Sequence, residues 1–231
     1  MPGLAALLTP IFSQPQTQVA LIEFDSAVSL VQDFTHREDL IDKPLTQPHS
    51  GDGGAAILDA MQYAVRLLEH TPEGQQPVIL LISETRDHGS HSARIRDVIE
   101  AIGEGNTVLY ALPFSPSLSQ VLDTERGSNR DERRPVGDFL APLMMASQAV
   151  RKNTPKAIAS MTGGEYELFS SRKSFERLMT EFTNRLHSRY LLSFQAQDPH
   201  PGLHQVRVRL RDAENRTVLA RTSYWAAGQK P

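Results

Sequence analysis

Oxygen-bearing side chains gather after two apolar runs of this 231-residue chain, Val19–Phe24 and Val78–Ile82. The polar residues that follow these runs are Asp25, Ser26, Ser83, Glu84, Thr85 and Asp87. If both runs are parallel strands, these groups meet at the carboxyl edge of one sheet, where ligands collect in open α/β folds. Carboxylate and hydroxyl oxygens are the ligands that Mg²⁺ and Mn²⁺ prefer, so a cation site is the first chemistry to consider.

A glycine-rich segment, residues 51–55, precedes a predicted helix and could join the same edge. Backbone N–H groups at such a turn can bind phosphate. The lysine of a P-loop is missing, however, and no GxGxxG pattern follows a strand. We therefore interpret Gly53 and Gly54 as residues that a tight turn requires, and Asp59 further on as a solvated or capping carboxylate.

Signatures of catalysis are weak. Ser83 lacks the flanking glycines of a nucleophile elbow, and none of the eight histidines has the HExxH spacing. Asp87 and His88 are interpreted as parts of a solvated loop. Because no acid, base and nucleophile form a set, we predict a protein that is not an enzyme and uses no cofactor. The alternative is an uncharacterised hydrolase or nucleotide-binding enzyme that uses the same edge.

Hydrophobic periodicity predicts strands and helices in alternation, which is typical of a doubly wound, largely parallel sheet. We expect strands at 19–24, 27–34, 78–82, 107–112 and 165–169, and helices at 3–12, 38–44, 57–70, 95–102, 139–150, 154–162 and 175–186. The strand at 27–34 should be antiparallel and on the edge. Thr35 with Glu38 suggests a capping box, and Pro44 and Gly103 should each end a helix. Residues 113–137 are expected to form a loop or an insertion.

The C-terminal part differs in pattern. Period-two alternation in residues 189–196, 204–211 and 216–225 predicts three antiparallel strands. The predicted division is thus an α/β domain over 1–187 and an antiparallel β extension over 188–231, packed on or continuing that domain. Arg207, Arg209 and Arg211 share one face of a predicted strand, which we interpret as a solvent face rather than a nucleic-acid surface.

These features together resemble a von Willebrand factor A (VWA) domain, in particular the VWFA-related proteins of Acidobacteria and their relatives. The resemblance rests on the order and spacing of short motifs, which are Gly53-Gly54-Ala55, Ile82-Ser83-Glu84-Thr85, Thr162-Gly163-Gly164, Tyr190-Leu191-Leu192-Ser193-Phe194 and Arg221-Thr222-Ser223-Tyr224. It implies a Rossmann-like VWA sheet, mostly parallel, with helices on both faces and a C-terminal antiparallel β extension. It also implies a protein-interaction module.

The same resemblance implies a metal-ion-dependent adhesion site with three contributions, and this chain departs from each of them. The DxSxS motif of the family's first strand does not occur in the sequence. Ala55 stands where the family has threonine, and a methyl group cannot coordinate a cation. Glu84 stands at the position of an aspartate, and its extra methylene displaces the carboxylate. We therefore predict a degenerate site that holds no metal.

The absent DxSxS motif belongs to a strand that lies, in the family's usual order, at the centre of the sheet between 19–24 and 78–82. Two unpaired edges would be left inside a buried sheet, which backbone hydrogen bonding does not tolerate. We expect that these two strands pair directly, or that another chain fills the gap. The sequence upstream of the Met1 codon would show whether such a strand is encoded there.

Composition narrows the class of partner but does not name one. The net charge of −3 argues against a general polyanion binder, and no apolar run reaches the ~20 residues that span a bilayer. There is no cysteine, so the compartment is undetermined, although members of the resembling family are often exported. We expect an unidentified protein partner, no nucleic acid and no membrane span, with oligomerisation through sheet edges as a structural alternative. The partner-binding edge is expected at Asp25, Ser26, Gly53, Gly54, Ala55, Ser83, Glu84, Thr85 and Asp87.

Overall fold

A computed structural model of the chain describes residues 7–47, 49–72, 74–115, 153–196, 200–211 and 218–226. Its strands are β1 (Val19–Phe24), β2 (Val28–Thr35), β3 (Val78–Ser83), β4 (Val108–Pro113), β5 (Gly202–Gln205) and β6 (Ser223–Ala226). Its helices are α1 (Thr9–Phe12), α2 (Glu38–Thr46), α3 (Ile57–Leu68), α4 (Ile95–Glu104), α7 (Thr154–Thr162) and α8 (Arg172–His187). The fold is of the α/β class, as the sequence predicts.

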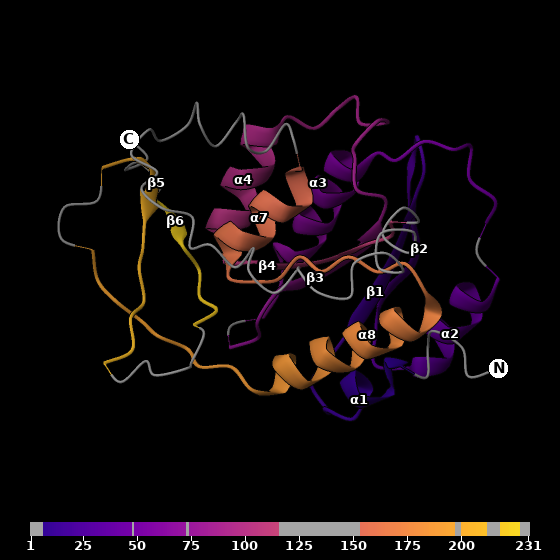
Figure 1. Ribbon diagram of the computed structural model, residues 1–231, viewed down its shortest axis with the longest axis horizontal. Helices are drawn as coiled ribbons and strands as arrows, with labels where there is room; N and C mark the ends of the chain where they lie inside the picture. Colours follow the sequence, from indigo (N-terminus) through magenta and orange to yellow (C-terminus); the bar gives the residue numbers. More distant parts are fainter. Residues whose placement is uncertain are drawn as a thin grey trace, which may run out of the picture.

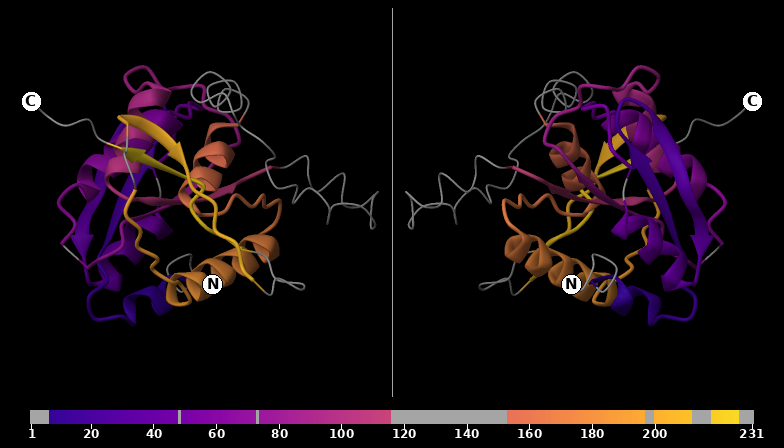
Figure 2. Two further views of the ribbon diagram at one scale, coloured as in Figure 1. Left: turned by 90° about the vertical axis from the view of Figure 1, so that its left-hand side faces the viewer. Right: turned by 90° about the vertical axis from the view of Figure 1, so that its right-hand side faces the viewer.

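Helices cover the strands on both faces (Figures 1 and 2). On one face α3, α4 and α7 pack on β3 and β4 through a core that includes Ile57, Val98, Leu109 and Ile158. On the other face α1, α2 and α8 form a second core, which includes Ile41, Tyr110, Met179 and Phe182. All six residues of β4 are buried, as expected for a strand between two helical layers.

The strands form three separate pairs rather than one continuous sheet. β1 pairs with β2 antiparallel, and β3 pairs with β4 parallel. Residues 165–169 extend the second pair along β4 through two isolated parallel bridges, Ala111 to Tyr166 and Phe114 to Phe169. They are therefore parallel, as predicted, but too irregular to count as a full strand. The expectation that 19–24 and 78–82 pair directly is wrong, because no ladder joins β1 and β3.

Several predicted element ends are wrong for local reasons. α2 continues through Pro44 to Thr46, and its N-cap residue, Arg37, has no side-chain cap. The capping box does not form, because the Thr35 hydroxyl accepts a hydrogen bond from the Arg37 N–H instead. Of the predicted helix at 3–12 the described part is helical only over α1. The predicted helix at 139–150 and most of the 113–137 loop lie outside the described residues.

The C-terminal part also differs from its prediction. Only β5 and β6 form an antiparallel pair, and neither 189–196 nor the arginine-bearing 206–211 belongs to a strand. The apolar side chains of the first segment are consequently exposed, with Tyr190 at 95%. The turn predicted at 212–215 lies outside the described residues.

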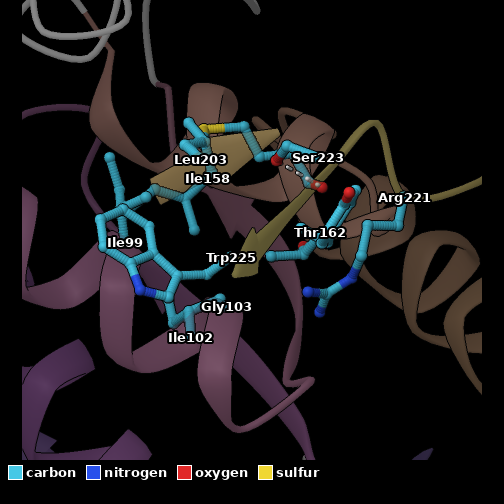
Figure 3. Close-up of a pocket in the computed structure, with 11 residues that line it drawn as sticks. Ile99, Ile102, Gly103, Ile158, Thr162, Leu203, Arg221, Ser223 and Trp225 are labelled. Atoms are coloured by element: carbon cyan, nitrogen blue, oxygen red, sulfur yellow. Dashed lines mark hydrogen bonds between the residues drawn. The ribbon is translucent and has the colours of Figure 1, made fainter. Parts of the chain in front are cut away.

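β6 attaches to the α/β part through Trp225, the chain's only tryptophan. Figure 3 shows its indole beside Ile99, Ile102 and Gly103 of α4. A Cβ added at Gly103 would lie 2.7 Å from the Trp225 Cβ, so the close packing of Trp225 on α4 requires a glycine at this position. Gly103 was predicted to end the helix, but α4 runs on to Glu104, with Gly105 as its C-cap.

Gly103→Ala should therefore loosen the attachment of β6 to α4. We expect a loss of about 1–2 kcal/mol of stability from overpacking, and a red shift of the tryptophan emission as the indole becomes wetter. Urea titration followed by fluorescence measures both effects on one reporter. Gly51→Ala is the matched control, since its added Cβ would meet its nearest atom at 3.4 Å, an ordinary contact.

Candidate functional site

The polar residues predicted to meet do lie together, at the carboxyl ends of β1 and β3. Asp25 begins this arrangement, because its side chain accepts hydrogen bonds from the N–H of Ala27 at 2.8 Å and of Asp52 at 3.3 Å. Its backbone carbonyl accepts a further bond from the Ala56 N–H at 2.7 Å. The end of β1 is thereby joined to the start of α3.

The glycine-rich turn is held by Asp52. Its Oδ1 accepts from the N–H of Gly54 at 2.8 Å and of Ser26 at 3.2 Å, and these bonds, led by Gly54, lower the pKa of the carboxyl. Gly53 has φ +86°, a left-handed value that favours glycine. A Cβ at Gly54 would lie 2.1 Å from the Ser26 Oγ. Both glycines are thus structural, as the sequence suggests.

The loop after β3 supplies the N-terminal cap of α3. The helix's own N-cap residue, Ala56, offers no side chain for this purpose. Instead Asp87 Oδ2 accepts from the Leu58 N–H at 2.8 Å, and Ser90 Oγ accepts from the N–H groups of Leu58 and Asp59 at 3.0 and 3.1 Å. The prediction that Asp87 belongs to a solvated loop is wrong, because its carboxylate is half-buried and caps a helix.

Asp59, a residue of α3, in turn accepts hydrogen bonds from the loop. Its two carboxylate oxygens accept hydrogen bonds from the backbone N–H groups of His91, Ser92 and Ala93, the shortest at 2.6 Å. Burial is the largest single influence and raises the pKa of Asp59, but these bonds together outweigh it and leave the pKa lowered. We call the reciprocal pairing of Asp87 and Ser90 with Asp59 the helix–loop lock.

The loop also covers Ala55. The Ala55 carbonyl accepts from the His88 N–H at 3.2 Å, and a Cβ at Gly89 would lie 2.9 Å from the Ala56 N. The Ala55 side chain is consequently buried. His88 is exposed, and its Nε2 lies 3.0 Å from the Gly53 carbonyl oxygen, a contact that raises the pKa of the imidazole together with a second one to Arg86.

These contacts allow a test of whether a cation fits. Asp25, Asp52, Asp59 and Asp87 each accept backbone N–H bonds, so their oxygens are directed at the chain. Position 55 offers a buried methyl group, and the Ser83 hydroxyl donates to the Glu84 carbonyl at 2.8 Å. Among the described residues no three His, Cys, Asp or Glu residues gather as cation ligands would. The residues present do not fit a divalent ion of octahedral preference.

Of the predicted edge residues, Gly53 and Glu84 are exposed and Ala55 is buried, while the others are partly exposed. Sequence reasoning missed Ser90, which has no motif of its own. The available signal was the lack of a capping side chain at Ala56, which requires a cap from elsewhere in the chain. No described helix is long and apolar enough to cross a membrane.

Comparisons with known proteins agree with this geometry. Residues 3–110 match the family model of the von Willebrand factor type A domain. Two similar structures, each with a TM-score of 0.50, are an aerotolerance-related membrane protein from Bacteroides fragilis (17% identity, 78% of this chain and 86% of that one) and BatB from Bacteroides thetaiotaomicron (14%, 79% and 86%). A von Willebrand factor type A protein from Catenulispora acidiphila also has a TM-score of 0.50, at 12% identity, over 78% of this chain and 37% of its own.

The predicted resemblance to a VWA domain is confirmed by these matches. At these identities the structural likenesses establish the fold alone. A comparison with curated proteins finds no match.

Proposed function

We propose that this VWA-type domain is a non-enzymatic protein-interaction module that binds its partner at the carboxyl edge without a metal ion. The proposal rests on one observation, which is that the carboxylates at this edge accept hydrogen bonds from the backbone of the chain. They hold the turn at 51–54 and the loop at 84–93 in one fixed shape, through bonds such as those of Asp52 and Asp87. A pre-organised polar surface of this kind loses little conformational entropy on binding a protein.

The exposed rim of this surface has a defined composition. Gly53, Glu84 and His88 are exposed around the half-buried Ser26 and Thr85. Glu84 supplies an exposed carboxylate. His88 supplies a donor, and its raised pKa favours the charged form of the imidazole. Such a mixture of single charges and hydroxyls suits the polar rim of a protein partner.

Site-specific crosslinking tests the location of the partner surface. A photo-reactive phenylalanine analogue placed at Glu84 should give a covalent adduct with one polypeptide in cells that make the protein. The same analogue at Gln76, which is exposed at the opposite end of β3, should not. Equal adducts at both positions, or adducts at Gln76 alone, would refute the assignment of the carboxyl edge.

Metal independence gives a separate prediction. A site with a Kd of 0.1 mM would add about 2.7 kcal/mol of stability at 10 mM ligand, which is easily seen as a rise in Tm. We expect no change in Tm on adding 10 mM MgCl₂ or MnCl₂, and none on adding EDTA, in a thermal-shift assay. A Mg²⁺-dependent rise in Tm that disappears in Glu84→Ala would overturn the no-metal proposal and leave the partner edge itself untouched.

A further inference from the structure

Two arginines from distant parts of the chain meet at the amino-terminal half of β4. The Arg221 Nη2 donates a hydrogen bond to the Thr107 carbonyl at 2.8 Å, and Thr107 immediately precedes β4. The Arg189 guanidinium, just beyond the end of α8, lies over the Tyr110 ring at 5.9 Å from its centroid. That distance is within the range of a cation–π contact. We call Arg189 and Arg221 the arginine pair.

The two guanidinium groups are close enough to repel each other. Burial lowers the pKa of Arg221, and the positive charge of Arg189 lowers it further. Arginine nevertheless stays protonated in proteins, so both positive charges persist at pH 7. Arg221, which Figure 3 shows beside Thr162, is partly buried, whereas Arg189 is exposed. A ligand can therefore reach the pair from solvent along Arg189.

The arginine pair has no carboxylate partner in the part of the chain that the structure describes. None of the ion pairs there involves Arg189 or Arg221. By contrast Arg185, four residues before Arg189, pairs with Glu165 and Glu181. Charges that folding withdraws from water are ordinarily paired, because an unpaired one loses solvation without compensation. The arginine pair lacks the counter-charge that Arg185 has.

The donors of the arginine pair suit an oxyanion. A guanidinium carries five N–H donors and no acceptor. Arg221 uses one of them on the Thr107 carbonyl, a bond that also fixes the position of the group. No hydrogen bond of the described residues uses the donors of Arg189. Guanidinium groups bind phosphate oxygens in a bidentate manner, and two positive charges match a phosphate dianion better than a single carboxylate.

Charge is distributed unevenly along the chain, and the C-terminal part favours anions. Residues 188–231 hold seven Lys and Arg residues and three Asp and Glu residues, although the whole chain has a net charge of −3. A local excess of one charge raises the local concentration of oppositely charged ligands, and salt screens this effect. An anion is therefore attracted to the C-terminal part rather than to the acidic remainder.

We infer that Arg189 and Arg221 together bind one phosphate group, either inorganic phosphate or a small phosphate monoester. The dianion accepts N–H bonds from both guanidinium groups and cancels their repulsion. It thereby ties the segment that follows α8 to the segment that precedes β6. The site lies toward the amino end of β4, away from the partner surface at the carboxyl edge, and does not depend on that surface.

A titration with inorganic phosphate tests the inference. Binding is followed by ³¹P NMR and by thermal shift, with the ionic strength held constant by NaCl. We expect one phosphate per protein with a Kd of about 1 mM, and a rise in Tm of about 4 °C at about 20 mM phosphate. Glycerol 3-phosphate is titrated in parallel. Binding of both ligands shows that the site accepts monoesters, whereas binding of phosphate alone shows a site for the free ion.

Matched variants locate the site. Arg189→Gln should weaken phosphate binding at least tenfold, because it removes one of the two charges, and it should fold because Arg189 is exposed. Arg209→Gln removes the same charge from another exposed arginine of the C-terminal part and should bind like the wild type. Arg221→Gln should also lose binding, but Arg221 holds the Thr107 carbonyl as well. Arg189→Gln therefore decides the test, whether or not Arg221→Gln folds.

Three results would overturn the inference. Phosphate that raises the Tm of Arg189→Gln as much as that of the wild type acts as a stabilising salt, which means an adventitious ion only. Absence of saturation in the ³¹P titration would show that there is no site. Equal affinity for acetate would show that one negative charge suffices, against a phosphate site. The crosslinking at Glu84 and the MgCl₂ experiment are unaffected by any of these results.

Discussion

Gly164→Ala should unfold the protein or cost it more than about 4 kcal/mol of stability, which is exceptional for a single added methyl group. A Cβ at this position would lie 1.9 Å from the Leu109 carbonyl oxygen and 2.7 Å from its carbonyl carbon. Those atoms belong to β4, whose residues are all buried, so neither partner can move aside without breaking the core.

The neighbouring residues show why the backbone approaches so closely here. The Thr162 hydroxyl accepts a hydrogen bond from the Leu109 N–H at 3.0 Å and donates one to the Ala159 carbonyl. Gly163, with φ +77°, is the C-cap of α7, and its N–H donates to the Ala159 carbonyl. The Gly164 N–H donates to the same carbonyl. The Thr162-Gly163-Gly164 motif therefore holds the C-terminal end of α7 against β4.

Urea titration followed by circular dichroism measures the effect of Gly164→Ala. Gly51→Ala again serves as the control, because it makes the same chemical change in open contact and should alter stability by less than about 0.5 kcal/mol. If the urea midpoint of Gly164→Ala equals that of the wild type, Gly164 lies farther from Leu109 than the structure shows.

Sequence patterns predicted the elements whose apolar periodicity is decided locally. β1, β3 and β4 are continuous apolar runs, and α3, α4 and α8 each carry one apolar stripe, so their types and approximate ends are correct. The antiparallel β1–β2 hairpin was also predicted, and only three residues separate its strands. These choices depend on neighbours along the chain.

The errors arise where a distant contact decides the outcome. α4 continues through Gly103, whose lack of a side chain leaves room for Trp225. α2 continues through Pro44, although proline lacks an N–H. The segment 189–196 alternates like a strand but finds no strand partner among the described residues. Alternating apolar and polar residues predict which side chains of a strand share a face. Strand formation also requires a neighbouring strand to pair with, and the alternation does not show whether one is available.

The candidate site shows the same division. Its place at the carboxyl edge could be predicted from the sequence, as could the alanine at position 55, where the resembled family has threonine. The cap on α3 could not, because Asp87 and Ser90 lie some thirty residues from the N–H groups that they accept from. Likewise no pattern along either strand shows that β1 and β3 do not pair, and only the family resemblance pointed to a missing strand between them.

Asp59→Ala should cost about 3 kcal/mol at pH 7, because it removes a carboxylate that accepts three backbone N–H bonds. It leaves those donors in the 91–93 segment without their acceptor. The loop should then open as a unit, and amide exchange at His91 and Ala93 should accelerate before global unfolding. Asp97→Ala is the matched control, since Asp97 also lies in the first turn of a helix, α4, but is exposed.

The effect should depend on pH in a definite direction. The folded-state pKa of Asp59 is lowered, chiefly by its backbone hydrogen bonds acting against burial. A lowered pKa gives stability that is fully present above the unfolded-state value of about 3.9 and is lost as pH falls through the folded-state value. The difference in unfolding free energy between wild type and Asp59→Ala should thus be constant from pH 8 to 5 and shrink below pH 4.

Asp59→Asn separates charge from geometry in this helix–loop lock. The amide keeps one oxygen for the N–H of Ala93 but loses the negative charge near the start of α3, where it also interacts favourably with the helix dipole. We expect an intermediate loss of about 1 kcal/mol that is constant from pH 8 to 5 and shrinks below pH 4, as the wild-type carboxylate becomes protonated. If Asn and Ala lower stability equally, the charge rather than the hydrogen-bond geometry holds the loop. If neither variant differs from Asp97→Ala, the lock contributes nothing to stability, and the fixed shape of the carboxyl edge needs another cause.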